Sequence, residues 1–206
     1  MSRVSQLRRV RRLYDRDPDA YHRAMSSSAT RWMLAGRRER VGEIVRGKVL
    51  DVGFGTGLSL PYYPPLVEVV GVDVSLPMLQ RAVGAERARL VQADAAHLPF
   101  ADRSFDSVAF NLCLCTIPDP ERAIGEAVRV VLPGAPMVFL EHVRSHILPV
   151  ALIQEVLNPA MVALQADHFN RRTADMVRRA GVEITSVDRW LLGVFNLIVG
   201  RAPAHP

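Results

Sequence analysis

Three glycines alternate with other residues directly after an apolar run, in the segment Val49-Leu50-Asp51-Val52-Gly53-Phe54-Gly55-Thr56-Gly57. Glycine lets a backbone approach a ligand more closely than any residue with a side chain can. The spacing departs from the dinucleotide fingerprint, because Leu58 stands where its third glycine belongs. NAD is therefore disfavoured. Asp51, two residues before the first glycine, would repel a pyrophosphate but attract a ligand ammonium group.

Two further acids follow later apolar runs. Asp73 comes roughly 20 residues beyond the glycine loop, where a carboxylate can accept hydrogen bonds from both hydroxyls of a ribose. Asp94 is placed to accept a hydrogen bond from the amino group of an adenine, and Met78 and Ala96 are placed to pack on the adenine ring. Taken singly, both acids are more typical of solvated strand ends. In register with the loop they indicate an adenosine cofactor with an ammonium group, and S-adenosylmethionine carries both.

Candidates for chemistry on a substrate lie further along the chain. His142 follows Glu141 at the end of an apolar run, and His168 follows Asp167 before a helical stretch. A histidine near a thiol of ordinary pKa, about 8.5, can remove its proton. The alternative is a packed or capping histidine. Cys113 and Cys115 are too close in sequence for an unstrained disulfide or a complete zinc site, so they indicate reduced, buried thiols.

The elements that must position these residues alternate between apolar runs and helical stretches, which is typical of a parallel sheet in βαβ units. Ser75 is expected to cap a helix that runs through Val83, and Asp119 is expected to open a helix that ends near 132–134. A third helix is expected to open near Asn170 and to end at Gly181. An apolar, proline-interrupted stretch covers Ile147–Ala166. The predicted strands are Lys48–Val52, Glu68–Val72, Ala88–Gln92, Phe105–Leu112, Pro136–His142, Glu183–Trp190 and Val194–Val199.

The chain of 206 residues is expected to form one domain, with a helical lid over residues 1–46 and a Rossmann-like core over 47–206. The predicted lid helices are Arg8–Tyr14, Pro18–Met25 and Thr30–Val45. Hydrophobic residues make up 49% of the chain and no run reaches the roughly 18 uninterrupted apolar residues of a membrane span. The start lacks the apolar core of a secretion signal, so a cytoplasmic protein is expected. The net charge of +5 comes almost wholly from arginine, and the aromatic content of 6% argues against nucleic-acid binding.

Several of these segments together resemble the class I S-adenosylmethionine-dependent methyltransferases: Asp51–Gly57, Val72–Ser75, Asp94–Phe100 and Ser104–Asp106. The resemblance implies an α/β, doubly wound, seven-stranded sheet, mostly parallel with an antiparallel last strand, plus N-terminal helices. Tyr14-Asp15-Arg16 with Tyr21 resembles the Y-D-x-x-A-x-x-Y-D opening of the small quinone, phospholipid and thiol methyltransferase branch, although Asp17-Pro18-Asp19 and His22 depart from it. The cofactor-binding residues expected on these grounds are Tyr14, Tyr21, Asp51, Gly53, Phe54, Gly55, Thr56, Gly57, Asp73, Val74, Met78, Asp94, Ala95, Ala96, Asn111 and Leu112.

The acceptor of the methyl group stays open at this point. The segments Leu140–Val143, Asn158-Pro159 and Asn170–Thr173 look most like the thiol methyltransferase-like members, which makes a thiol on a small molecule one candidate. The alternatives are a phospholipid or quinone-precursor methyltransferase and a cofactor-binding protein without catalysis. His142, Glu141 and His168 are the candidate catalytic residues. No metal requirement is expected, because the sequence shows no cluster with metal-ligand spacing.

The N-terminal helix is expected to be amphipathic. At 100° per residue, Val4, Leu7, Val10, Leu13 and Tyr14 share one side, and Arg8, Arg9, Arg12 and Arg16 the other. One interpretation is a surface helix with solvated arginines. The other is a lid over the substrate pocket that also contacts an anionic membrane surface, where each arginine contributes about 1 kcal/mol.

Overall fold

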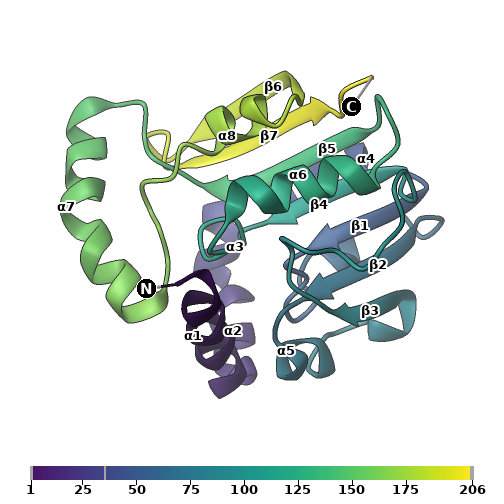
Figure 1. Cartoon of the computed structure of the whole chain (residues 1–206). Coiled ribbons are helices and arrows are strands. Elements are labelled where there is room, and N and C mark those ends of the chain that lie inside the picture. The colour runs from purple at the N-terminus through teal and green to yellow at the C-terminus, as the bar shows by residue number, and fades with distance from the viewer. Residues whose placement is uncertain (1, 35, 205–206) are drawn as a thin grey trace.

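The computed structural model describes residues 2–34 and 36–204. A seven-stranded sheet runs through the molecule in the order β3-β2-β1-β4-β5-β7-β6, with β7 antiparallel to both of its neighbours and the other adjacent pairs parallel (Figure 1). The predicted doubly wound fold is therefore confirmed. The strands are β1 (Lys48–Val52), β2 (Glu68–Asp73), β3 (Ala88–Gln92), β4 (Ser107–Asn111), β5 (Pro136–His142), β6 (Glu183–Trp190) and β7 (Phe195–Arg201).

Helices cover both faces of the sheet, and each face has its own apolar cluster. Ile124 and Val177 bring α6 and α8 onto one face, while Val41 and Leu79 bring α4 and α5 onto the other. The helices are α1 (Arg3–Arg16), α2 (Pro18–Met25), α3 (Ser28–Leu34), α4 (Arg37–Ile44), α5 (Leu76–Gln80), α6 (Pro120–Val130), α7 (Leu148–Gln165) and α8 (Thr173–Arg179), with short 3₁₀ turns η1 (Leu60–Tyr62) and η2 (Ala85–Arg87).

The helix boundaries follow local capping chemistry. The side chains of Ser75 and Asp119 accept hydrogen bonds from the backbone of the first turns of α5 and α6, as the sequence predicts. The predicted helix over 30–45 is instead two helices, because Gly36 adopts a left-handed conformation between α3 and α4. The helix predicted to open near Asn170 begins at Thr173, because the Asn170 side chain donates to Glu155 rather than capping the helix.

Two other expectations about the elements are wrong, and one stretch without a predicted element is a helix. The N-terminal helix is longer than 8–14, since Ser2 caps it from the front. Strand β4 is shorter than predicted at both ends, because Phe105 pairs only in an isolated bridge with Val131 and Leu112 turns to a φ of 55°. The apolar stretch after Ile147 is the helix α7, which lies at the edge of the molecule (Figure 1). By length and composition α7 could cross a membrane, and only 11% of it is buried.

Candidate active site

The glycine loop turns directly after β1 and is held against β2. The N–H groups of Gly53 and Phe54 both donate to the carbonyl oxygen of Val72, at 2.8 and 3.0 Å. Gly53 has a φ of 72°, and a Cβ at this position would lie 2.3 Å from the Cβ of Cys113. Glycine is therefore required here both for its backbone conformation and for its lack of a side chain.

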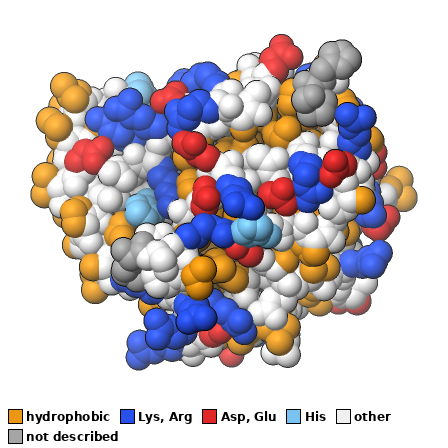
Figure 2. Space-filling view, viewed as in Figure 1, with side chains coloured by type: hydrophobic (Ala, Val, Ile, Leu, Met, Phe, Trp, Pro, Cys, Tyr) orange, Lys and Arg blue, Asp and Glu red, His pale blue; other side chains and the backbone are white. Residues whose placement is uncertain are grey.

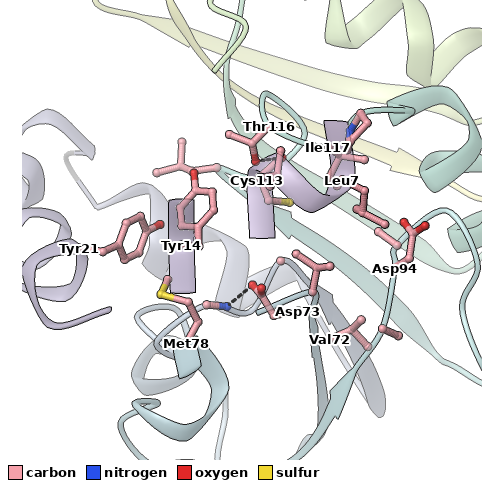
Figure 3. Close-up of a pocket in the computed structure, with 18 residues that line it drawn as sticks. Leu7, Tyr14, Tyr21, Val72, Asp73, Met78, Asp94, Cys113, Thr116 and Ile117 are labelled. Carbon is pink, nitrogen blue, oxygen red and sulfur yellow. Dashed lines mark hydrogen bonds between the residues drawn. The ribbon is translucent and has the colours of Figure 1, made fainter. Parts of the chain in front are cut away.

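Asp73 is the last residue of β2 and lies next to this loop. Its Oδ2 accepts the Gly55 N–H at 2.9 Å and its Oδ1 accepts the Ser75 N–H at the same distance. Burial raises the pKa of Asp73 to about 6, although these hydrogen bonds oppose the shift. Figure 3 shows Asp73 at the floor of a pocket, with Tyr14 and Met78 on its walls. The carboxylate lies where a ribose could reach it.

Helix α1 roofs this pocket. Leu7, Val10 and Tyr14 line it from α1, and Arg3 contacts the Asp94 carboxylate and approaches His97 to 3.2 Å. The free volume beneath the roof is about 70 Å³, well below the several hundred Å³ typical of a ligand pocket. We therefore expect α1 to move outward and Arg3 to release Asp94 when a nucleoside binds.

A second, polar pocket on the other side of the loop surrounds Asp51. The Asp51 carboxylate is almost fully buried and accepts hydrogen bonds from the Tyr63 hydroxyl at 2.9 Å and the Asn111 amide at 3.1 Å. Burial raises the pKa of Asp51 to about 7, against the lowering effect of these two hydrogen bonds. Arg38 lines the same pocket, and burial lowers the pKa of its guanidinium.

These groups fit the amino-acid end of S-adenosylmethionine. The Asn111 Oδ1 atom is buried with no hydrogen-bond partner among the described residues, and it needs a donor. An ammonium group would supply that donor and also the positive charge that would favour ionised Asp51. Arg38 is placed to pair with a carboxylate. The sequence did not single out Arg38, because nothing in its spacing separates it from the many other arginines.

A much larger apolar cavity, of about 670 Å³, adjoins the pocket over Asp73. Tyr14, Tyr21 and Leu112 line both spaces, so these three side chains form the boundary between them. The two tyrosine rings meet edge to face with centroids 5.6 Å apart. Burial raises the pKa of both phenols, which keeps them protonated at neutral pH.

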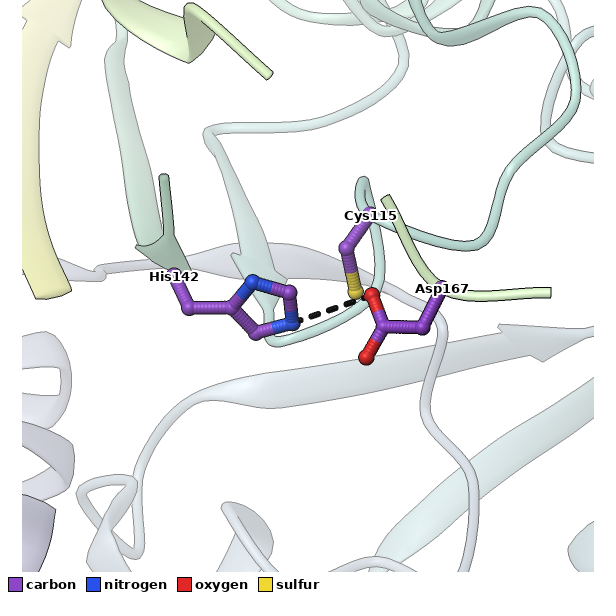
Figure 4. Close-up of side chains that lie close together, drawn as sticks. All are labelled: Cys115, His142 and Asp167. Atoms are coloured by element: carbon purple, nitrogen blue, oxygen red, sulfur yellow. Dashed lines mark ion pairs between the residues drawn. The ribbon is translucent and has the colours of Figure 1, made fainter. Parts of the chain in front are cut away.

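Three chemically active side chains gather on one wall of the apolar cavity. Figure 4 shows Cys115, His142 and Asp167, which come from the turn after β4, the end of β5 and the segment after α7. The His142 Nε2 atom lies 3.2 Å from Asp167 Oδ1, and one ligand atom of each residue lies within 4.8 Å of the others. Phe169 packs edge to face on the His142 ring, at 4.8 Å between centroids. The spacing of these three residues in the sequence does not indicate a metal site, but the fold brings them together within the reach of one metal ion.

The other two candidate catalytic residues lie elsewhere. Glu141 is fully buried and its Oε1 accepts the N–H groups of Cys113 and Leu114, both at 3.0 Å. Burial raises its pKa to about 7. Alternation along β5 points Glu141 away from the cavity that His142 lines. Among the described residues that line the cavity it is Asp167, and not His168, that accompanies His142.

Several expected cofactor-binding residues do not line the pocket over Asp73, although Phe54 and Thr56 line the polar pocket around Asp51. Phe54 packs beneath the sheet, where a Cβ on Gly71 would lie 2.5 Å from its ring. Thr56 contacts His22, at 3.0 Å between Oγ1 and Nδ1. His22 thus ties α2 to the loop, although the sequence marked it only as a departure from the branch motif. Gly57 and Ala96 are buried behind the loop and the third strand, whereas Gly55, Val74, Ala95 and Met78 do line the pocket.

Comparison with known proteins decides the family. Residues 50–139 match the methyltransferase domain family. A demethylmenaquinone methyltransferase of Thermobifida fusca is 33% identical over 166 residues, which cover 75% of this chain and 68% of the relative. The chain belongs to the class I S-adenosylmethionine-dependent methyltransferases. In this methyltransferase the glycine loop, Asp73 and the Asp51 pocket lie where the family's cofactor, S-adenosylmethionine, is expected to bind.

Other relatives extend the comparison. A phosphatidylethanolamine N-methyltransferase from Cereibacter sphaeroides is 40% identical over 118 residues, which cover 54% of this chain and 58% of the relative. The chain spans only 38–58% of the length of the first curated relatives that it matches. An O-methyltransferase family protein from Burkholderia thailandensis shares the fold, with a TM-score of 0.70 at 19% identity over 92% of this chain and 60% of the other.

Replacing Asp73 by alanine is expected to weaken binding of S-adenosylmethionine about ten- to a hundredfold. The loss of charge-assisted hydrogen bonds to ribose hydroxyls costs about 1.5–3 kcal/mol. Calorimetric titration measures the affinity, and Asp73→Asn serves as a second variant that keeps the side-chain shape. Asp188→Ala is the matched control, because Asp188 lies on the edge strand β6, at the opposite end of the sheet from β3 and β2. Unchanged affinity in a folded Asp73→Ala protein would show that the assignment of this acid is wrong.

Proposed function

We propose that this methyltransferase transfers the methyl group of S-adenosylmethionine to a lipid-like acceptor that carries a weakly acidic thiol or phenolic hydroxyl. The proposal depends mainly on one observation, which is that the cofactor pocket and the large apolar cavity share Tyr14, Tyr21 and Leu112 as a common wall. An acceptor in the apolar cavity would therefore face the cofactor across these side chains. The names of the phospholipid and quinone-precursor methyltransferase relatives support a lipid-like acceptor.

The chain's own residues supply a proton acceptor for such a substrate. When bound, the cofactor supplies an electrophilic methyl group on a sulfonium, whose carbon–sulfur bond breaks as the acceptor atom attacks. Asp167 faces His142 Nε2 and favours a proton on that nitrogen, which leaves the lone pair on Nδ1. The Nδ1 atom has no hydrogen-bond partner among the described residues and is buried, so the imidazole ring must turn to present it to an acceptor in the cavity. The acceptor's S–H or O–H proton would pass to this lone pair as the new bond to carbon forms.

Neighbouring groups keep the reaction on the acceptor. Burial raises the pKa values of Cys113 and Cys115, so both thiols stay protonated and are weak nucleophiles. The Tyr14 and Tyr21 phenols are held neutral in the same way. The cavity wall is apolar apart from a few groups, which disfavours water on the path between the two ligands.

Helix α1 acts as a lid in this proposal. Its residues Leu7, Val10 and Tyr14 cover the cofactor pocket, and Leu13 covers the acceptor cavity. Val4, predicted to share this side, is exposed. Ser75 Oγ donates to Asp15 Oδ1 at 2.6 Å and fixes the C-terminal part of α1 to the start of α5. Full turnover after deletion of residues 1–14 would contradict this role.

The acceptor class is tested with isotopically labelled methyl donor and a panel of acceptors. We expect transfer to long-chain alkyl thiols, thiophenols or reduced naphthoquinones, and weaker transfer to short, water-soluble thiols, because the cavity favours apolar groups. Phosphatidylethanolamine vesicles test the amine alternative. Transfer to this amine alone would contradict the weakly acidic acceptor. Cofactor binding without transfer to any member would instead support a non-catalytic cofactor-binding protein.

A further inference from the structure

Helix α7 exposes an unusual amount of apolar surface. Six of its large apolar side chains are more than half exposed, and Val156 reaches 79%. Glu155 is the only charged residue in the helix. Exposed apolar patches of this kind mark interaction surfaces. The six side chains, called here the α7 face, are Leu148, Leu152, Ile153, Val156, Leu157 and Leu164.

The opposite side of α7 is fixed to the body of the protein. Gln154 accepts the Ser145 N–H at 2.7 Å and donates to the carbonyls of Val143 and Phe169, both at 2.9 Å. Glu155 pairs with Arg144 at 3.1 Å. A helix of 18 residues is about 27 Å long, slightly short of the roughly 30 Å of a hydrocarbon core, and it contains Pro159. Because these polar contacts hold its middle, α7 can lie along a surface but cannot cross a membrane without breaking them.

Positive charge borders the α7 face. Arg9, on α1, donates to the carbonyls of Val162 and Ala163 near the C-terminal end of α7, and this contact joins the two helices. Arg8, Arg12 and Arg16 follow one another at four-residue intervals on α1 and are exposed. Figure 2 shows orange side chains along the edge formed by α7 and a blue cluster over α1 and α2. An apolar helix beside a row of arginines matches the interface of a bilayer with anionic lipids.

The junction of these helices also reaches the apolar cavity. Leu13 from α1 and Leu164 and Gln165 from α7 line the cavity, and Leu164 is at the same time largely exposed. We infer that the α7 face and the α1 arginines dock on an anionic bilayer, with this junction as the entrance through which a lipid-soluble acceptor passes. Only the last part, the entrance, rests on the proposed function.

Vesicle flotation of the full chain tests the docking. We expect binding to vesicles of phosphatidylcholine with phosphatidylglycerol, reduced as salt rises, and weaker binding to phosphatidylcholine alone. The double variant Ile153→Asp, Val156→Asp should lower the partition coefficient at least about tenfold, since two apolar side chains leave the lipid. Leu66→Asp is the matched control, because Leu66 is 98% exposed and lies outside α7.

Charge reversal tests the arginines separately. Arg8→Glu with Arg12→Glu should lower binding to the anionic vesicles at least about tenfold and remove most of its salt dependence, whereas Arg89→Glu on the edge strand β3 should not. Thermal melting shows whether each variant is folded. Absence of binding at low salt, or equal salt-independent binding to both vesicle types, would overturn the inference. Concentration-dependent dimerisation that Val156→Asp abolishes, without vesicle binding, would overturn it in favour of a second copy of the chain.

Turnover separates the docking from the proposed function. The Ile153→Asp, Val156→Asp variant should retain activity on an acceptor dissolved in detergent micelles and lose at least about tenfold on the same acceptor held in anionic vesicles. Neither residue lines the acceptor cavity. Vesicle binding without any methyl transfer would support the docking surface and contradict the proposed function. Equal loss on both acceptor forms in a folded variant would contradict the entrance.

Discussion

Replacing His142 by alanine is expected to lower turnover on an alkyl thiol by about 10²- to 10⁴-fold, with unchanged affinity for S-adenosylmethionine. The size of the effect is that of removing a general base from a proton-transfer step. Asp167→Asn should cause a smaller loss, and the double variant should be no slower than His142→Ala, because the two residues act as one unit. Turnover is measured under saturating cofactor, and cofactor affinity by calorimetry.

The acceptor and a control variant make this test specific. A thiophenol that is already ionised at the assay pH needs no base, so His142→Ala should slow its methylation far less. His168→Ala is the matched control, because His168 neighbours Asp167 in sequence but does not line the cavity with it. Equal losses on ionised and neutral acceptors would contradict a base role. Turnover lost to a chelator and regained with zinc would assign Cys115, His142 and Asp167 to a metal ion instead.

Affinity for S-adenosylmethionine is expected to pass through a maximum between about pH 7 and 8. Asp51 has a pKa of about 7 in the protein, so below that pH its carboxylate binds a proton that the cofactor's ammonium must displace. The affinity then falls up to about tenfold per pH unit, and Asp73, with a pKa of about 6, adds to the fall. Above about pH 8 an α-amino group loses its own charge. The Asp51→Asn variant should bind S-adenosylmethionine more weakly, and its affinity should begin to fall only below about pH 6, where Asp73 binds a proton.

Thermal stability provides an independent measure of the link between cofactor binding and the ionisation of Asp51. The raised pKa of Asp51 means that the folded chain binds a proton more tightly than the unfolded chain. Its contribution to the free energy of unfolding is therefore full below about pH 4 and is lost as pH rises through about 7. Because the cofactor compensates the buried charge, the rise in Tm that it produces should grow between pH 6 and 7.5. A pH-independent rise would contradict the assigned partner of Asp51.

The sequence was sufficient for the elements that form the sheet and for the acids at their ends. Four of the seven predicted strands, β1, β3, β5 and β6, have the observed limits, because each is a short run bounded by turn residues. Asp73 could be placed from sequence alone, since strand ends of a doubly wound sheet meet at one edge. Local pattern does carry the information in these cases.

The remaining features depend on tertiary structure. His142 and Asp167 are separated in sequence by the whole of α7 and meet only because the chain returns to the cavity at its end. Glu141, adjacent to His142, faces the opposite side of β5, so closeness in sequence was misleading. The prolines in 147–166 obscured α7, although Pro149 lies in the first turn, where proline is tolerated. Only the structure shows that Arg38 is buried beside Asp51, whereas many other arginines of the chain are exposed to solvent.

The contact between α1 and α7 bears on how a newly made chain matures. Arg9 and its partners Val162 and Ala163 lie more than 150 positions apart along the chain. Contacts so distant along the chain form slowly. This contact therefore forms later than the hydrogen bond between Asp15 and Ser75, which joins α1 to α5 across 60 positions. Until the contact made by Arg9 forms, the junction of α1 and α7, which lines the apolar cavity, stays open to water.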